Sequence, residues 1–196
     1  MAQGPGGTRG EGTGKGVAGG GEAGRAEGRA PPLILALALD PASFARLDAE
    51  RWAHFPPQLN RVPAHVTLFH HLPGEAEGEV AAALARACAG MAPAPVRVTG
   101  LIPLGRGVAY RLDAPEVAAL RASLARAWEA WLTPQDRQPW RPHVTVQNKV
   151  APAEAQALLA RLRAGFAPWE ATATGLLLRR YRGGPWEAAG AFPFAA

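Results

Sequence analysis

Several kinds of residue and segment are scarce in this 196-residue sequence, and each shortage excludes a class of protein. Cys88 is the only cysteine, so the chain can form no intramolecular disulfide and offers no thiolate cluster to a metal. The one strongly apolar run, PPLILALALD, is too short to span a bilayer and too far from the start for an ordinary signal peptide. We therefore expect a soluble, cytoplasmic protein in which Cys88 is a small buried hydrophobe.

The first thirty residues lack the side chains that build a core. They contain 12 of the 23 glycines and a single valine, but no leucine, isoleucine or aromatic residue. Such a segment cannot bury enough apolar surface to offset its ordering entropy. We expect residues 1–30 to be a disordered Gly-rich tail, or the product of a misassigned start codon. Residues 31–196 are expected to form one domain, large enough to bury about 70% of its unfolded surface.

Lysine and acidic residues are also scarce. Outside the first thirty residues the chain has 17 Lys and Arg against 13 Asp and Glu, a net charge of +4, and Lys149 is the only lysine among them. Arginine presents a planar fork suited to phosphate, so this charge is compatible with an anionic partner. A GC-rich coding sequence would also enrich arginine, and composition alone favours that second explanation.

Hydrophobic periodicity predicts strands that alternate with helices. In each half of the chain a helix precedes a strand with the pattern H-x-T, and a helix and two strands follow it. This order predicts an α+β fold with an internal duplication. Strands are expected at 33–39, 65–71, 95–105, 107–113, 143–147, 170–180 and 186–194, and helices at 41–55, 75–89, 115–132 and 152–162.

The repeated strand motif is HVTL from His65 and HVTV from His143. With five His and eight Thr in the chain, random order gives roughly 0.2 such H-x-T matches, so two in equivalent places exceed chance. Side chains alternate along a strand, and a pseudo-twofold axis would turn both His–Thr faces to one cleft. The side chains expected on these two faces are His65, Thr67, Phe69 and His71, and His143, Thr145, Gln147 and Lys149.

Two facing imidazoles suit phosphodiester chemistry. Their ordinary pKa of about 6.5 allows one ring to be neutral and the other protonated near neutral pH. The neutral ring can take a proton from water while the cation protonates the leaving oxygen, and each contributes on the order of 10²–10⁴-fold. The hydroxyls of Thr67 and Thr145 could donate hydrogen bonds to the non-bridging oxygens. This scheme needs no metal or other cofactor.

These two tetrapeptides resemble the paired H-x-[T/S]-x motifs of the two-histidine phosphoesterase superfamily, and especially its bacterial 2'-5' RNA ligase-like and cyclic-phosphodiesterase members. The resemblance covers residues 32–196, including HFPPQLNRVPAHVTLFHHLPG and the C-terminal GLLLRRYRGGPWEAAGAFPF. It implies a bilobal, pseudo-twofold α+β fold with antiparallel sheets lining a central basic cleft. It also implies metal-independent hydrolysis of 2',3'-cyclic phosphates, on RNA ends or nucleotides, to the 2'-phosphate, with reverse 2'-5' RNA ligation.

Carried over by position, the resemblance makes His65 and His143 the acid–base pair and Thr67 and Thr145 the phosphate ligands, without showing which histidine is the base. Further candidates for substrate binding are charged or aromatic side chains near the motifs, each of which could equally be an ordinary surface or core group. They are Arg61, Arg106, Arg141, Lys149, His71, Phe69, Tyr110 and Trp140. By contrast, Trp128 and Trp131 are expected in the core, and His70 on the core side of its strand.

Three alternatives remain open from the residues alone. A metal site of His65, His71 and His143 would lack a nearby carboxylate or cysteine, which disfavours it. The substrate could be ADP-ribose 1'',2''-cyclic phosphate or another small cyclic ester. The chain could also be a non-catalytic RNA-binding module, although binding alone would not require both motifs. We expect a monomer whose partner is RNA or a nucleotide with a cyclic phosphate end.

Overall fold

Strands and helices follow one another in the predicted order. The computed structural model describes residues 30–195, so the expected tail lies outside the described residues except for Ala30. The 3-10 turns within this range are Pro57–Leu59, Gly74–Ala76 and Glu129–Trp131. Its helices and strands are β1 (Leu33–Leu39), α1 (Pro41–His54), β2 (Val66–Leu72), α2 (Glu77–Ala89), β3 (Ala94–Pro103), β4 (Val108–Asp113), α3 (Pro115–Ala127), β5 (His143–Gln147), α4 (Pro152–Ala164), β6 (Trp169–Arg180) and β7 (Glu187–Pro193).

One aspartate sets the start of α1 and ties it to the sheet. Asp40 is the N-cap residue: its Oδ1 accepts a hydrogen bond from the backbone N–H of Ser43 at 2.9 Å, and Pro41 occupies the first turn. The second oxygen accepts the backbone N–H of Thr172 on β6 at 2.8 Å. A single carboxylate therefore caps the N-terminus of α1 and holds that terminus against the central strand β6.

The helix expected over residues 115–132 is shorter than predicted, because α3 ends at Ala127 and a 3-10 turn follows. Trp128 is buried where the helix ends, with its ring edge-on to Phe69 at 5.4 Å between centroids. Trp131 stacks on Trp128 at 6.4 Å. Both tryptophans pack with the core, as the periodicity predicted.

All the described strands join one antiparallel sheet in the order β2-β1-β6-β3-β4-β5, with β7 on β6. The long strand β6 belongs to both halves: Trp169–Ala173 pairs with β3, and Ala173–Arg180 pairs with β1. β7 takes over the second edge of β6 from Gly175 onward. A Cβ on Gly175 would lie 2.5 Å from the carbonyl oxygen of Phe192, so this crossover admits only glycine.

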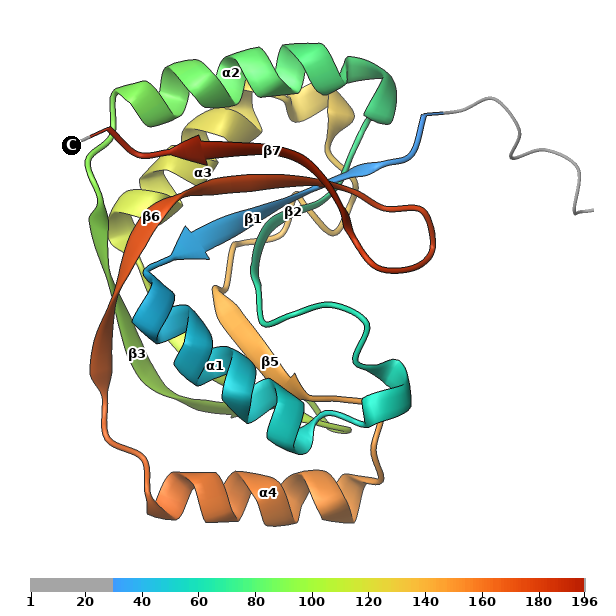
Figure 1. Ribbon diagram of the computed structural model, residues 1–196, viewed down its shortest axis with the longest axis vertical. Helices are drawn as coiled ribbons and strands as arrows, with labels where there is room; N and C mark the ends of the chain where they lie inside the picture. The colour runs from blue at the N-terminus through green and yellow to red at the C-terminus, as the bar shows by residue number, and fades with distance from the viewer. Residues whose placement is uncertain (1–29, 196) are drawn as a thin grey trace, which may run out of the picture.

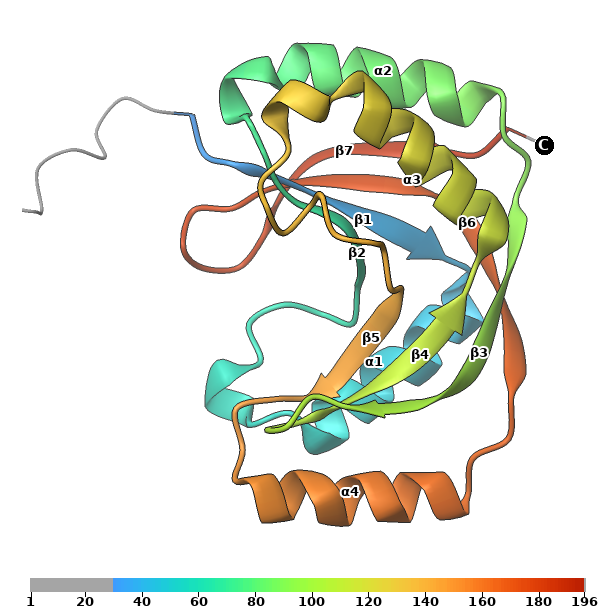
Figure 2. The same ribbon diagram turned by 180° about the vertical axis from the view of Figure 1, so that it is seen from behind.

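The molecule has two lobes that share β6. Figure 1 shows α2 and α3 side by side over the lobe that contains β1, β2 and β7, while α4 covers β3 and β4 at the opposite end. α1 packs against β5, on the inner side of the second lobe (Figure 2). This arrangement confirms the predicted bilobal α+β fold, with the two expected sheets joined into one.

The two motif strands are the two ends of the sheet. β2 and β5 stand at opposite ends of the strand order, yet they contact each other. Figures 1 and 2 show how this is achieved, because the twisted sheet curls until its ends face one another. An end strand leaves one row of backbone groups without a strand partner. The closure of the cleft therefore depends on what binds those groups.

A buried arginine of the first half binds the second motif strand. Arg51 lies on α1 and is 4% exposed. Its Nη1 donates to the carbonyl oxygen of Thr145 on β5 at 2.7 Å, and its Nε donates to Asn60 Oδ1 at 2.8 Å and to the carbonyl oxygen of Val62 at 3.0 Å. The guanidinium also covers the ring of Phe55, 4.1 Å from its centroid. Arg51 thus joins α1, the loop before β2, and β5.

A buried arginine of the second half binds the first motif strand in return. Arg121 on α3 donates from Nε to the carbonyl oxygen of Leu68 on β2 at 2.9 Å and from Nη2 to that of Asp136 at 2.7 Å. Trp140, just before β5, donates to the carbonyl oxygen of Thr67 at 2.9 Å. Each half therefore supplies a helix arginine that holds the motif strand of the other half.

A bulge follows the His–Thr pair on β2. Ala36 of β1 lies opposite Thr67, but Leu35 lies opposite Phe69, so β2 carries one extra residue between them. A bulge turns the following side chains to the other face of the sheet. Phe69 is accordingly 0% exposed in the core. The expectation that Phe69 lies on the cleft face, where it could stack on a nucleobase of the substrate, is wrong.

The same bulge occurs on β5. Ala109 of β4 lies opposite Thr145, but Val108 lies opposite Gln147. Gln147 is therefore buried at 3% exposure, away from the face that was predicted for it. The strand then ends, and the left-handed backbone of Lys149, with φ of 64°, carries that side chain away as well. In both copies the alternation that aligns His with Thr stops at Thr.

The cross-bracing leads to a stability prediction. Arg121→Met leaves the carbonyl oxygens of Leu68 and Asp136 without this donor, so we expect the free energy of unfolding to fall by about 3 kcal/mol. Arg126→Met, at an exposed arginine on the same helix, should change it by less than about 0.5 kcal/mol. Urea unfolding followed by tryptophan fluorescence measures both. Equal losses in the two variants would mean that the buried guanidinium does not hold β2.

Candidate active site

The facing ends of the sheet enclose a cavity of about 360 Å³. Its wall includes both histidines and both threonines of the repeated motif: His65 and Thr67 from the β2 side, and His143 and Thr145 from β5. The pseudo-twofold arrangement that the sequence implied therefore brings these four side chains to one place. His65 immediately precedes β2 and His143 is the first residue of β5, so both lie ahead of the bulge described above.

The two imidazoles are oriented in the same way. His65 Nδ1 lies 2.7 Å from the carbonyl oxygen of Pro63, and His143 Nδ1 lies 2.8 Å from that of Arg141, in each case two residues upstream. A carbonyl oxygen only accepts, so Nδ1 carries the proton in both rings. Nε2 is then the nitrogen left to exchange a proton with a ligand in the cavity. The backbone around the motif thus selects one tautomer twice.

The threonines are fixed through their backbones, and their side chains remain on the cavity wall. The carbonyl oxygen of Thr67 accepts from Trp140, and that of Thr145 accepts from Arg51. These bonds cross from one half to the other, so they set the distance between the two strands as well as the positions of the residues. Both threonines line the same cavity as the histidine of their own motif, and their hydroxyl groups can donate to a phosphoryl oxygen.

The environment of His65 makes it a neutral group. Its ring lies 4.5 Å from the ring of Trp186, between centroids. Burial lowers the pKa of His65 to about 4, and the nearby positive charge of Arg51 contributes in the same direction. At pH 7 the ring is therefore unprotonated, and its Nε2 can accept a proton.

Of the further candidates, two lie in the cavity. Arg141 and Trp140 line it, both from the segment that leads into β5. Trp140 gives its N–H to Thr67, so its ring position is fixed, while Arg141 provides positive charge beside His143. The sequence argument that placed Arg141 two residues before His143, on the cleft side, agrees with this location.

The other candidates lie elsewhere. Arg61 is exposed and is not part of the cavity wall. Lys149 lines a separate hollow with Trp52 and Glu154. Arg106 is in the β3–β4 turn, where its Nε donates to the carbonyl oxygen of Val150 at 3.1 Å. These three cations are therefore away from the motif residues.

Two ring-bearing candidates are also removed from the cavity. Tyr110 is 9% exposed and packs near Phe166, and burial raises the pKa of its hydroxyl to about 12. His71 is exposed and is not part of the cavity wall, so the expectation that it shares the catalytic face is wrong. The alternative metal site of His65, His71 and His143 is consequently not assembled. Among residues 30–195, no group of three or more His, Cys, Asp or Glu side chains is arranged to hold a metal ion.

Sequence reasoning missed several residues of the wall. His70 was assigned to the core side, but it lines the cavity because of the bulge that precedes it. Trp186 comes from the turn between β6 and β7, and only the strand pairing of the C-terminus could have indicated its place. Gln135 and Gln138 stand on the segment between α3 and β5, together with the buried Asp136. The spacing of these three residues in the sequence gives no indication that they line the cavity.

Two other expectations concern features outside the cavity. Cys88 is 1% exposed, as expected for a small buried hydrophobe, and burial raises the pKa of its thiol to about 11. None of the helices in the described residues has the length and apolar character needed to cross a membrane.

Comparisons with known proteins agree with the site. A family model described as the 2'-5' RNA ligase superfamily matches residues 39–185, a range that contains both motifs. A search of curated protein sequences gives no match. Because the family match extends over more than half of the chain, it carries the assignment by itself.

Solved structures share the fold. TT0787 of Thermus thermophilus has a TM-score of 0.61 and 21% identity, and the match covers 83% of this chain and 97% of that one. E. coli LigT complexed with 3'-AMP has a TM-score of 0.56 and 19% identity, covering 85% of this chain and 99% of that one. LigT complexed with phosphate has a TM-score of 0.54 and 18% identity, with coverage of 86% and 99%. The duplicated motif, the curled sheet and the family match lead to one assignment, and the chain belongs to the 2'-5' RNA ligase superfamily of two-histidine phosphoesterases.

Proposed function

We propose that this protein is a metal-independent phosphodiesterase that hydrolyses 2',3'-cyclic phosphates, on RNA ends or nucleotides, to the 2'-phosphate. The observation that carries the proposal is the pair of imidazoles in one cavity, each with Nδ1 on a carbonyl oxygen and Nε2 left for the substrate. A threonine hydroxyl accompanies each ring. Positioning and charge stabilisation are most of what phosphoryl transfer requires of a protein.

His65 is assigned as the general base. Its lowered pKa of about 4 keeps Nε2 unprotonated at neutral pH, so it accepts a proton from the attacking water. The water oxygen bonds to phosphorus as the P–O3' bond breaks. The same low pKa favours loss of the accepted proton at neutral pH, so the ring returns to the neutral form before the next turnover.

His143 is then the general acid, which gives its Nε2 proton to the leaving O3'. The product keeps its phosphate on O2'. Ligation would follow the same course with the 5'-hydroxyl of a second RNA in place of water, and the two histidines exchange roles when the cyclic ester is re-formed. Thr67 and Thr145 donate to the two non-bridging oxygens, which gain charge as the new bond forms. Atoms and protons balance with water as the only co-reactant.

The ligand classes bound by a similar fold support a phosphate-bearing substrate. LigT of E. coli has been crystallised with 3'-AMP, with NADP+, with ATP and with phosphate. The cavity of about 360 Å³ suits a terminal nucleotide and leaves the rest of an RNA outside. ADP-ribose 1'',2''-cyclic phosphate is the second candidate, because it offers the same cyclic ester to the same four residues.

The first prediction concerns turnover and both histidines. With EDTA present, the wild type should hydrolyse 2',3'-cyclic AMP to 2'-AMP, and His65→Ala and His143→Ala should each lower kcat/KM by about a hundredfold to ten-thousandfold. Chromatography of the products distinguishes the 2'- from the 3'-phosphate. His54→Ala, at a surface histidine that pairs with Glu50, is the matched control and should retain activity.

Loss of turnover on adding EDTA would contradict the mechanism. If no cyclic mononucleotide is cleaved, a short RNA with a cyclic phosphate end and ADP-ribose 1'',2''-cyclic phosphate are the next substrates. Binding of that RNA without cleavage of any of the three would identify an RNA-binding module in place of the enzyme.

The second prediction concerns pH. Because His65 must be neutral to act as base, kcat/KM should hold as the pH falls below 6.5 and decline only near pH 4. Trp186→Ala opens the ring of His65 to water, so its pKa and the acid limb of the profile should both rise toward 6.5. An NMR titration of His65 measures the same pKa without turnover. A wild-type acid limb near pH 6.5 would remove His65 from the role of base.

The third prediction concerns the threonines. Thr67→Val and Thr145→Val keep the side-chain shape but lose the hydroxyl donor, so each should lower kcat/KM by about ten- to a hundredfold. Thr99→Val, on β3 outside the cavity, should leave kcat/KM unchanged. Full activity of both motif variants would show that the hydroxyls do not hold the phosphate.

A further inference from the structure

A buried aspartate stands behind the third histidine of the cavity. Asp136 is 1% exposed, and both of its carboxylate oxygens are occupied. Oδ1 accepts the backbone N–H of His70 at 2.8 Å and lies 3.0 Å from its Nδ1, while Oδ2 accepts the backbone N–H of His71 at 3.1 Å and the hydroxyl of Thr133 at 3.2 Å. Although burial alone raises the pKa of Asp136, the hydrogen bonds from His70 and His71 outweigh it and hold the pKa below its ordinary value.

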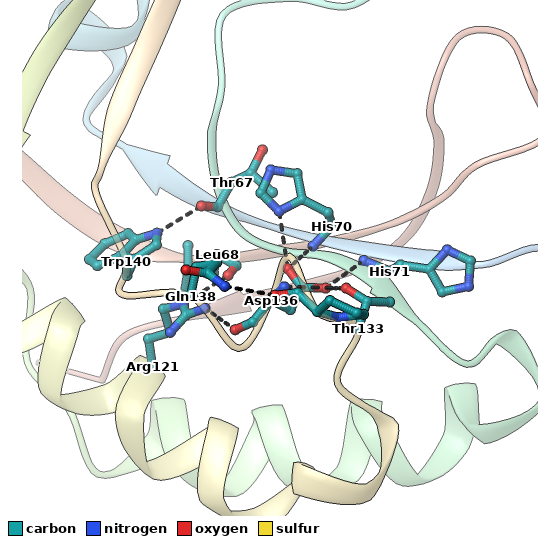
Figure 3. Close-up of polar contacts among 10 residues, drawn as sticks. Thr67, Leu68, His70, His71, Arg121, Thr133, Asp136, Gln138 and Trp140 are labelled. Atoms are coloured by element: carbon teal, nitrogen blue, oxygen red, sulfur yellow. Dashed lines mark hydrogen bonds and ion pairs between the residues drawn. The ribbon is translucent and has the colours of Figure 1, made fainter.

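This carboxylate sets the orientation of His70. A charged carboxylate only accepts, so Nδ1 of His70 carries a proton and Nε2 is the nitrogen presented to a ligand. Figure 3 shows one ring nitrogen of His70 bonded to Asp136 and the other on the side of Thr67, whereas the ring of His71 points away from the cluster. The ring of His70 lines the cavity and is close enough to His65 to affect its pKa. Asp136 thus holds a third imidazole in a fixed orientation near His65.

The cavity wall has more hydrogen-bond donors than one phosphate group can engage. A cyclic phosphodiester carries a single negative charge, which the two motif histidines and two threonines can hold. Beyond these, His70 and Arg141 face the same cavity. Asp136 is the only carboxylate that the described residues place in its wall, and it is already saturated with hydrogen bonds. A nucleoside 2',3'-cyclic phosphate offers these remaining donors only an uncharged 5'-hydroxyl and the base, and no second negative charge.

A second phosphate supplies that partner. In an RNA end, the ribose with the cyclic phosphate also carries a phosphate on its 5' oxygen, which joins it to the preceding nucleotide. The ribose of ADP-ribose 1'',2''-cyclic phosphate likewise carries a 5''-phosphate. A nucleoside 2',3'-cyclic phosphate has none.

We propose that His70, oriented by Asp136, is a binding site for the 5'-phosphate of the ribose that carries the reacting ester. His70 in its protonated form donates from Nε2 to a phosphoryl oxygen, and Asp136 holds the opposite side of the ring. Because of this site, the protein prefers RNA ends and 5'-phosphorylated nucleotides to nucleoside 2',3'-cyclic phosphates that lack a 5'-phosphate. This inference rests on the proposed function and refines it by naming the substrate class of the same cavity.

Binding of two product analogues tests the site without requiring turnover. Calorimetric titration with adenosine 2'-monophosphate and adenosine 2',5'-bisphosphate gives a ratio of two Kd values for each protein. The wild type should prefer the bisphosphate by roughly tenfold or more, as expected for a charge-assisted hydrogen bond. His70→Phe keeps a ring of similar size, and its backbone N–H still binds Asp136, so the preference should fall to about twofold or less.

His71→Ala is the matched control, because it removes the imidazole of the neighbouring residue, which is not part of the cavity wall. It should keep the wild-type ratio. Equal ratios in all three proteins, or an equal loss of affinity for both ligands in His70→Phe, would overturn the proposal. Thermal unfolding checks that His70→Phe is folded. If it is not, ¹⁵N-histidine spectra of the wild type decide, since only the bisphosphate should shift Nε2 of His70.

Two further arms separate the sources of the phosphate and the two proposals. A dinucleotide with a cyclic phosphate end and ADP-ribose 1'',2''-cyclic phosphate share the 5'-phosphate, and their kcat/KM values show which one the cavity prefers. Absence of turnover with a retained bisphosphate preference would refute the proposed activity and leave the site. Turnover without that preference would refute the site and leave the activity.

Discussion

The cleft exists because the two ends of one sheet are held face to face by side chains that cross between them. β2 and β5 are end strands, and curling the sheet brings their unpaired carbonyl groups toward the interior. Arg51 and Arg121 meet these carbonyls as buried cations, each from the helix of one half to the motif strand of the other. A buried guanidinium is costly unless its donors are satisfied, and here the satisfied geometry is only available when the cleft is closed. The position of the motif histidines and threonines is therefore coupled to the packing of both lobes.

The bulges on β2 and β5 also determine which side chains face the cavity. A regular strand would have continued the polar face past threonine, placing Phe69 and Gln147 in the cavity. The extra residue after Thr67 and after Thr145 turns those side chains into the core, so the polar face on the cavity ends at the two threonines. Bulges are common beside active sites because they re-aim a side chain without ending the strand. On β2 the bulge also brings His70 to the wall, where an unbroken strand would have brought His71.

The limits of the sequence follow from the range of the signals involved. Hydrophobic periodicity located the strands and helices, and two copies of H-x-T in equivalent places indicated His65, Thr67, His143 and Thr145, since these signals lie within a few residues. The bulges depend on register between strands, which no local pattern records, and so Phe69, His71 and Lys149 were misplaced. Nothing in the local sequence distinguishes Arg51 and Asp136 from ordinary surface charges, because the carbonyl and the imidazole that they bind lie 94 and 66 residues away. Burial of a charge is a tertiary property, and only the closed fold shows it.

A duplicated motif creates a difficulty that the structure answers. Two equivalent histidines would share one proton affinity, yet the acid–base mechanism proposed above needs one ring neutral and one protonated. The halves therefore have to differ around the rings, while the rings themselves keep the same tautomer. The difference lies in the surroundings of His65: Trp186, from the β6–β7 turn, covers its ring, and Arg51 adds positive charge beside it, so that burial first and charge second favour the neutral form. Duplication thus supplies a symmetric pair of His–Thr faces, and the turn between the last two strands breaks the symmetry that would otherwise leave the proposed acid and base interchangeable.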